Sequence, residues 1–91
     1  MAIQEGAAAS TSGRLYLVGG YDIARNSSAA VFVLAGTAWH DGPSLPIALN
    51  HPGAAALAGA VYVAGGFTST GATNRVFVLA EGAARWRELA L

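Results

Sequence analysis

Short apolar runs separated by glycine-containing polar segments make up most of this chain. Four of them occupy residues 14–18, 31–34, 60–64 and 76–79, and only Arg14 interrupts their apolar character. A short apolar run between turn residues is typical of a strand that is covered on both faces, whereas a strand exposed on one face alternates apolar and polar residues. We therefore expect four β-strands here, each buried on both faces.

The pattern occurs twice along the chain. Residues 13–21 read GRLYLVGGY and residues 59–67 read GAVYVAGGF, so a glycine, a spacer, four apolar residues, a glycine pair and an aromatic residue recur 46 residues later. The run VFVL also occurs twice, at 31–34 and 76–79. A period of this length predicts a protein built from two structural repeats.

Each repeat has room for two further strands. Residues 6–10 and 53–57 are small and apolar, and a glycine follows soon after each segment, so we expect a short strand and a turn there instead of a helix. Trp39 and Trp86 start the last strand, which becomes polar in the second copy, as an edge strand facing solvent should.

The connections between these strands are of two kinds. Segments 21–28 and 67–74 are rich in Ser, Thr, Asn and Gly and are predicted to be loops. The glycine pairs that precede them predict positive φ angles or the close approach of another backbone. The pairs are Gly19–Gly20 and Gly65–Gly66.

Four short meandering strands in units of about 45 residues are typical of a β-propeller blade. A two-sheet sandwich would show alternating apolar and polar residues instead. The predicted fold class is therefore all-β, with two four-stranded antiparallel blades. We place the first blade at residues 1–47 and the second at residues 48–91.

These features resemble the Kelch repeat family. The likeness rests on a tyrosine shortly before each glycine pair and on a tryptophan some twenty residues later, whereas the family's second tyrosine is missing and Leu34 and Leu79 stand near its place. The resemblance implies blades stacked around a central channel, with the loops between strands two and three, and those leading into the next blade, lining one binding face. The marks of the repeat are Tyr16, Gly19, Gly20 and Trp39, and Tyr62, Gly65, Gly66 and Trp86.

Two blades leave two outer faces uncovered. A face of four strands covers roughly 290 Å², and burying it contributes about 7 kcal/mol at ~25 cal/mol/Å², close to the ~5–15 kcal/mol net stability of a typical domain. Gly19 and Gly65 are 46 residues apart, and the distance from Gly65 through the C-terminus of one copy to Gly19 of a following copy is 45 residues. Copies joined head to tail would therefore keep nearly the same spacing between repeats. We expect a closed ring of copies, a homotrimer of six blades ahead of a dimer or tetramer. The alternative is a fragment or designed unit of a longer propeller.

Composition narrows the classes of partner. The chain is 54% hydrophobic and 11% charged, with a formal net charge of zero, so we expect neither nucleic acid nor a membrane as a partner. Cysteine is absent, and residues 1–5 do not resemble a signal peptide. No apolar run reaches the 18 residues of a membrane span. These features predict a soluble protein and leave its compartment undetermined.

Candidate chemistry is sparse. His40 and Asp41 are adjacent, so in a strand they point to opposite faces and do not form a catalytic pair. We expect no enzyme activity, cofactor or metal site, although similarity to Kelch-like enzymes such as galactose oxidase keeps catalysis as an alternative. The loops instead offer rings, amides and charges to a peptide or carbohydrate. The candidate ligand-binding residues are Tyr21, Asp22, Arg25, Asn26, Asn50, His51, Phe67, Thr68 and Asn74.

Overall fold

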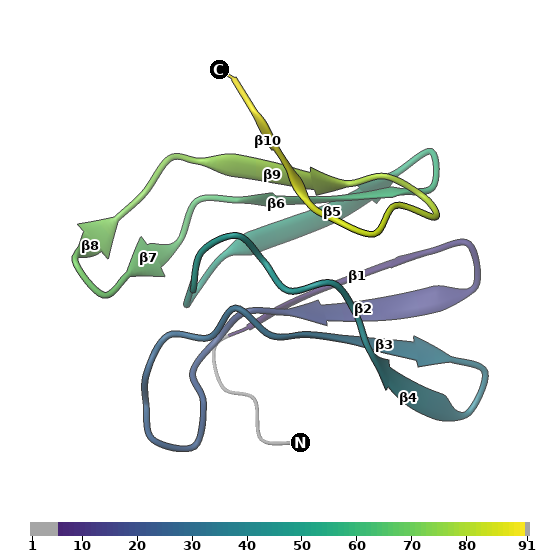
Figure 1. Ribbon diagram of the computed structural model, residues 1–91, viewed down its shortest axis with the longest axis horizontal. Helices are drawn as coiled ribbons and strands as arrows, with labels where there is room; N and C mark the ends of the chain where they lie inside the picture. The colour runs from purple at the N-terminus through teal and green to yellow at the C-terminus, as the bar shows by residue number, and fades with distance from the viewer. Residues whose placement is uncertain (1–5, 91) are drawn as a thin grey trace.

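The computed structural model describes residues 6–90, which fold into two four-stranded antiparallel sheets and, in that range, no helix (Figure 1). The all-β prediction is confirmed. The first sheet has the order β1 (Ala7–Thr11), β2 (Arg14–Val18), β3 (Val31–Ala35) and β4 (Ala38–Asp41). The second has the order β5 (Gly53–Leu57), β6 (Ala60–Ala64), β9 (Val76–Leu79) and β10 (Arg87–Leu89). Among residues 6–90, no helix is long and apolar enough to cross a membrane.

A small hairpin interrupts the second sheet's meander. Its strands are β7 (Phe67–Thr68) and β8 (Gly71–Ala72), within the segment that the sequence predicted to be a loop, so that prediction is wrong there. The hydroxyl of Thr68 accepts a hydrogen bond from the Thr70 amide at 3.2 Å and donates one to the carbonyl of Gly71 at 3.2 Å. These bonds close a turn that composition alone does not distinguish from a loop.

The register of the strands decides which side chains lie between the two sheets. Tyr16 pairs with Val33 in the first sheet, and Val63 pairs with Phe77 in the second. These residues belong to one hydrophobic core, with Tyr16 partly buried at its edge. The other buried core residues are Val18, Val31, Leu45, Leu49, Val61, Leu79 and Trp86.

The two sheets approach each other along their first strands. Strands β1 and β5 lie side by side, and the segment that joins β4 to β5 passes between the two sheets farther out (Figure 1). Leu45 and Leu49 of this linker are buried at 4% and 0% exposure. Trp86 is buried beside it, and its indole nitrogen donates a hydrogen bond to the carbonyl of Pro43 at 2.7 Å. The linker thus fills the space where the sheets diverge.

The glycine pairs allow the linker to approach closely. Gly19 has φ +65°, and a Cβ placed on it would lie 2.7 Å from the carbonyl oxygen of Leu49. Gly66 has φ +88°, and its Cβ would lie 2.7 Å from the carbonyl oxygen of Asn50. Both expectations for the glycine pairs, positive φ and a neighbouring backbone, are confirmed at these two positions.

Burial on both faces, which the continuous apolar runs predicted, is found in β9, where Phe77, Val78 and Leu79 are all buried, but not in β2 and β3. The outward-facing Leu15, Leu17 and Phe32 of those two strands are only half-buried. On the far side of the second sheet, Leu57 is 68% exposed. The reason is geometric, because each sheet has another sheet on one face only.

Candidate functional site

Three connecting segments meet at one end of the two sheets. They are the loop after β2, the linker before β5 and the hairpin after β6, and short antiparallel bridges join them. One bridge pairs Ser28 with Leu49, and the next pairs Asn50 with Phe67. The linker therefore lies between two loops that the resemblance to Kelch repeats implies are on one binding face.

Asn50 holds this meeting point together. Its side chain is buried, with 4% of the residue exposed. The amide nitrogen donates to the hydroxyl of Ser27 at 2.8 Å and to the carbonyl of Phe67 at 3.3 Å. The amide oxygen accepts a hydrogen bond from Nδ1 of His51 at 2.8 Å. One carboxamide thus connects the first loop, the linker and the hairpin.

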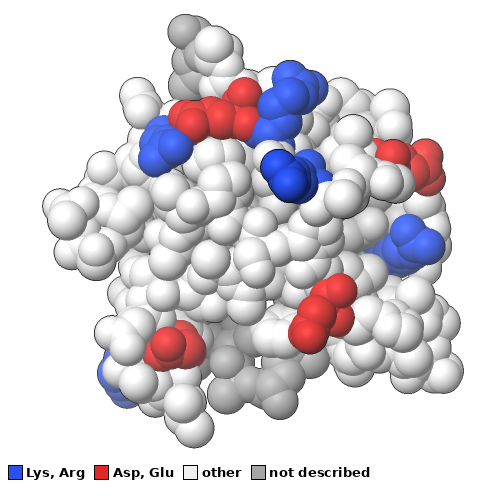
Figure 2. Space-filling view, viewed as in Figure 1, with Lys and Arg blue, Asp and Glu red and all other residues white. Residues whose placement is uncertain are grey.

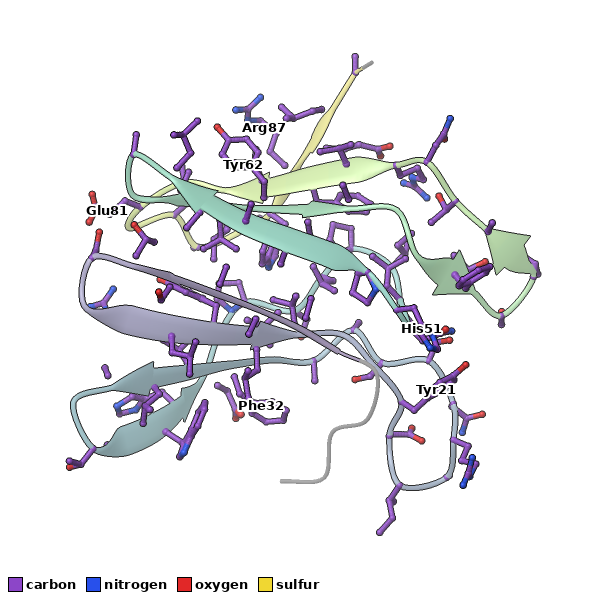
Figure 3. The ribbon with its side chains drawn as sticks, turned by 180° about the vertical axis from the view of Figure 1, so that it is seen from behind. Tyr21, Phe32, His51, Tyr62, Glu81 and Arg87 are labelled. Atoms are coloured by element: carbon purple, nitrogen blue, oxygen red, sulfur yellow. The ribbon has the colours of Figure 1, made fainter. Side chains whose placement is uncertain are left out.

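His51 lies between two aromatic rings. Its imidazole meets the ring of Tyr21 edge to face, with centroids 5.9 Å apart (Figure 3). It meets the ring of Phe67 in the same way, with centroids 6.1 Å apart. The backbone of His51 has φ +51°, and Phe67 is 48% exposed. Edge-to-face contacts of this kind fix the ring orientations. We call Tyr21, Asn50, His51 and Phe67 the aromatic cluster.

Asp22 has a local structural role. Its carboxylate accepts hydrogen bonds from the backbone amides of Ala24 and Asn26, both at 2.9 Å, and so closes the turn that follows Tyr21. This turn exposes Arg25, at φ +64°, and Ile23, which is 90% exposed. Sequence reasoning missed Ile23, because an isolated apolar residue inside a polar loop has no periodicity to reveal it.

A groove of about 510 Å³ lies between the first loop, the linker and the hairpin. Ile47 and Ala48 provide its apolar part, and Asn26 and Thr68 from the predicted set line it as well. The remaining lining residues were not predicted, although they lie in or beside the loops that the sequence identified. They are Ser27, Ser69, Thr70 and Arg75.

The structure divides the predicted ligand-binding residues into separate groups. Four form the aromatic cluster, and Asn26 and Thr68 line the groove. Asp22 and Arg25 belong to the turn beside Tyr21. Asn74 is exposed and lies outside the lining of the groove. The loop end therefore offers two distinct surfaces, one aromatic and one rich in hydroxyl groups.

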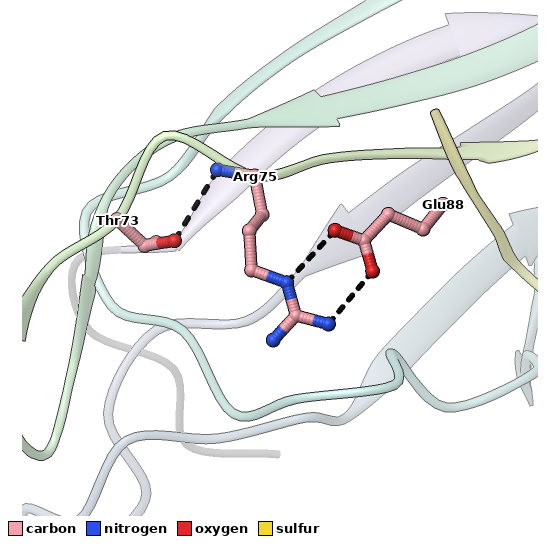
Figure 4. Close-up of polar contacts among 3 residues, drawn as sticks. All are labelled: Thr73, Arg75 and Glu88. Carbon is pink, nitrogen blue, oxygen red and sulfur yellow. Dashed lines mark hydrogen bonds and ion pairs between the residues drawn. The ribbon is translucent and has the colours of Figure 1, made fainter. Parts of the chain in front are cut away.

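An ion pair lies at the rim of the groove. Arg75 donates two hydrogen bonds to Glu88, at 2.9 Å from Nε and 2.7 Å from Nη2, and its amide donates to the hydroxyl of Thr73 (Figure 4). The bonds from Arg75 lower the pKa of Glu88, and the same contact raises the pKa of Arg75. The guanidinium also lies 5.3 Å from the ring centre of Phe77. Arg75 is thus held in place beside the groove.

The chemistry available at this end is recognition by hydrogen bonds and ring contacts. Hydroxyl and amide groups can donate to or accept from a polar ligand. Within residues 6–90, no three His, Asp or Glu side chains gather as metal ligands would. His40 pairs with Val33 and Asp41 with Phe32, so these adjacent residues lie on opposite faces of the first sheet.

Comparison with known proteins gives one informative likeness. No family model matches the chain. The chain is 37% identical over 67 residues to a Kelch domain-containing protein of Saccharolobus solfataricus, a stretch that covers 74% of this chain and 9% of the relative. The chain therefore matches only a small part of that relative. This likeness and the two antiparallel sheets are consistent with a Kelch-like repeat.

Proposed function

We propose that the chain is a non-enzymatic Kelch-like scaffold and binding module. In this proposal its two sheets are consecutive blades of a β-propeller, and further copies of the chain complete the ring. The observation that carries the proposal is that the two outward faces repeat the two faces buried between the sheets. Membership of the Kelch family is part of the proposal and is supported by the likeness reported above.

The outward face of the first sheet corresponds to the inward face of the second. Under the repeat, Leu17 corresponds to Val63, and Phe32 corresponds to Phe77. Val63 and Phe77 are completely buried, whereas Leu17 and Phe32 are half-buried. Figure 3 shows Phe32 on the side of the first sheet that faces away from the second. Leu15 and Leu34 repeat Val61 and Leu79 in the same way.

The outward face of the second sheet corresponds to the inward face of the first. Tyr62 repeats Tyr16, and Figure 3 shows Tyr62 on the side of its sheet away from the first sheet. On the outward face of the first sheet, where Trp39 pairs with Leu34, Trp39 repeats Trp86; Trp86 is buried at 7% exposure, yet Trp39 is 43% exposed. The two outward faces repeat the two faces that are buried against each other within the chain. The outward face of one copy can therefore pack head to tail on the other outward face of the next copy, which supports a closed ring of copies.

The loop end is where this module would bind a ligand. The groove combines hydroxyl and amide groups with an apolar part, which suits a carbohydrate or a peptide. Figure 2 shows charged groups in small scattered patches separated by broad uncharged areas on the face drawn. Scattered charge of this kind does not favour a polyanion as the ligand.

A pair of repeat-equivalent substitutions tests the proposal. Phe32→Arg places a charge on the outward face, so we expect a folded chain that no longer assembles. Phe77→Arg places the same charge in the core and should unfold the chain, since Phe77 is completely buried. Ile23→Arg, at the exposed loop tip, is the control and should change neither property. Circular dichroism measures folding and light scattering measures mass. A wild-type chain that stays folded and monomeric would favour the alternative, a unit of a longer propeller.

A further inference from the structure

A second cleft lies between the two sheets, at the end opposite the loop end that carries the groove and the aromatic cluster. Its volume is about 340 Å³. Arg14, Tyr16 and His40 line it from the first sheet, and Pro43, Leu79 and Ala83 line it from the linker, β9 and the segment after β9. None of these residues belongs to the candidate ligand set at the loop end.

Strand register explains why three polar side chains share this cleft. Tyr16 pairs with Val33, and Val33 pairs with His40. The side chains of Tyr16 and His40 therefore lie in one row on the inward face, on either side of Val33. Arg14 is two residues before Tyr16 on the same strand and therefore lies on the same face. Asp41 lines the cleft as well. It follows His40 in β4, so its side chain is on the opposite face of the sheet from Arg14, Tyr16 and His40.

The hydrogen-bonding groups of this row are not used within the described part of the chain. Arg14, Tyr16 and His40 form no side-chain hydrogen bond or ion pair with any of residues 6–90. Glu81 lies between Ala80 and Gly82, which line the far wall, and its carboxylate accepts a hydrogen bond from the hydroxyl of Ser12 at 2.7 Å. The cleft thus presents a guanidinium, a phenol and an imidazole, and the far wall is anchored by the bond from Trp86 to Pro43.

We propose that this cleft binds a small carboxylate with an apolar body. A guanidinium presents two parallel N–H groups that match the two oxygens of a carboxylate. The phenol of Tyr16 adds a donor, and Val33, Leu79 and Ala83 provide an apolar wall for the rest of the ligand. The volume lies at the small end of the usual range for ligand pockets, ~300–1,000 Å³. The site is formed within one chain, so it does not depend on ring assembly.

Titration with three matched probes tests the proposal. Benzoate carries the carboxylate, benzyl alcohol is its neutral counterpart, and phenyl phosphate carries a different anion. We expect benzoate to bind with chemical-shift changes at the backbone amides of Tyr16 and Ala83 in a two-dimensional NMR titration. Benzyl alcohol should bind at least about tenfold more weakly, because a hydrogen bond to a charged group contributes about 1.5–3 kcal/mol. Phenyl phosphate, whose anion can also pair with a guanidinium, should bind no more tightly than benzoate.

Two arginine substitutions locate the charge. Arg14→Gln should weaken benzoate binding at least about tenfold, whereas Arg25→Gln, at the opposite end of the sheets, should leave it unchanged. Arg14 is exposed, so its variant should keep the wild-type circular dichroism spectrum. His40→Gln should weaken binding less than Arg14→Gln.

Equal binding of benzoate and benzyl alcohol, tighter binding of phenyl phosphate, or an equal effect of the two arginine substitutions would overturn the proposal. Benzoate binding is measured per chain, so a failure to bind benzoate would not contradict the proposed ring. Likewise, a chain that stays monomeric would not contradict the proposed carboxylate site.

Discussion

Gly66 shows how a single missing Cβ permits two segments to meet. A Cβ there would lie 2.7 Å from the carbonyl oxygen of Asn50 and 3.0 Å from the backbone of Pro52, and the residue has φ +88°. Backbone atoms of a packed linker cannot move aside as a flexible side chain can. The position therefore combines a steric requirement with a conformational one.

Gly66→Ala should lower the free energy of unfolding by about 3 kcal/mol or more, from left-handed strain and overlap with the linker. Gly82→Ala is the matched control, because Gly82 has φ +75° with no atom within 4 Å of the added Cβ. Its cost should be about 1–2 kcal/mol, from conformation alone. Urea unfolding measures both values. Equal effects would contradict the close approach of the linker.

Asn50 gives a second test at this scale. Asn50→Ala removes hydrogen bonds to Ser27, His51 and the Phe67 carbonyl and should cost about 1–3 kcal/mol. Asn74→Ala removes an exposed amide and should change stability by less than about 0.5 kcal/mol. If chemical denaturation found no difference between the two variants, the buried amide would not hold the loops together.

At the level of strands, the sequence predicted the two meanders well because apolar runs and glycines mark their ends. The eight main strands lie within a residue or two of the expected positions, and the polar Arg87 and Glu88 are exposed as expected. The hairpin at β7 and β8 was missed because its turn depends on Thr68 hydrogen bonds. The groove was only partly predicted, since its lining depends on how three separated segments converge.

The ion pair between Glu88 of β10 and Arg75, the residue before β9, gives a pH-dependent prediction. Its hydrogen bonds lower the pKa of Glu88, so the stabilisation is present above the ordinary glutamate pKa and is lost as the pH falls through the lowered one. The effect should be small, because both side chains are more than 40% exposed. Glu88→Gln should therefore be less stable than wild type at pH 7 and equally stable well below the lowered pKa. Urea unfolding at both pH values measures this, and a difference that did not change with pH would contradict it.

For the whole molecule, the arrangement of the faces is more informative than any one residue. The sequence predicted apolar strands, but it could not show which of the alternating side chains in each strand face the other sheet. Strand register makes that assignment, and it places Phe32 and Tyr62 outward at positions whose repeats, Phe77 and Tyr16, pack at the interface between the sheets. The molecule therefore presents two apolar faces that are matched to each other by the repeat. Large exposed apolar faces are typical of interaction surfaces.

The mass of the wild-type chain in solution tests the central proposal most directly. Sedimentation equilibrium over a range of micromolar concentrations should give one species with three times the 9.1 kDa of the chain. A mass of two or four chains would keep the closed ring and change only the number of blades. A cooperatively folded species of 9.1 kDa at every concentration would contradict self-assembly through the outward faces.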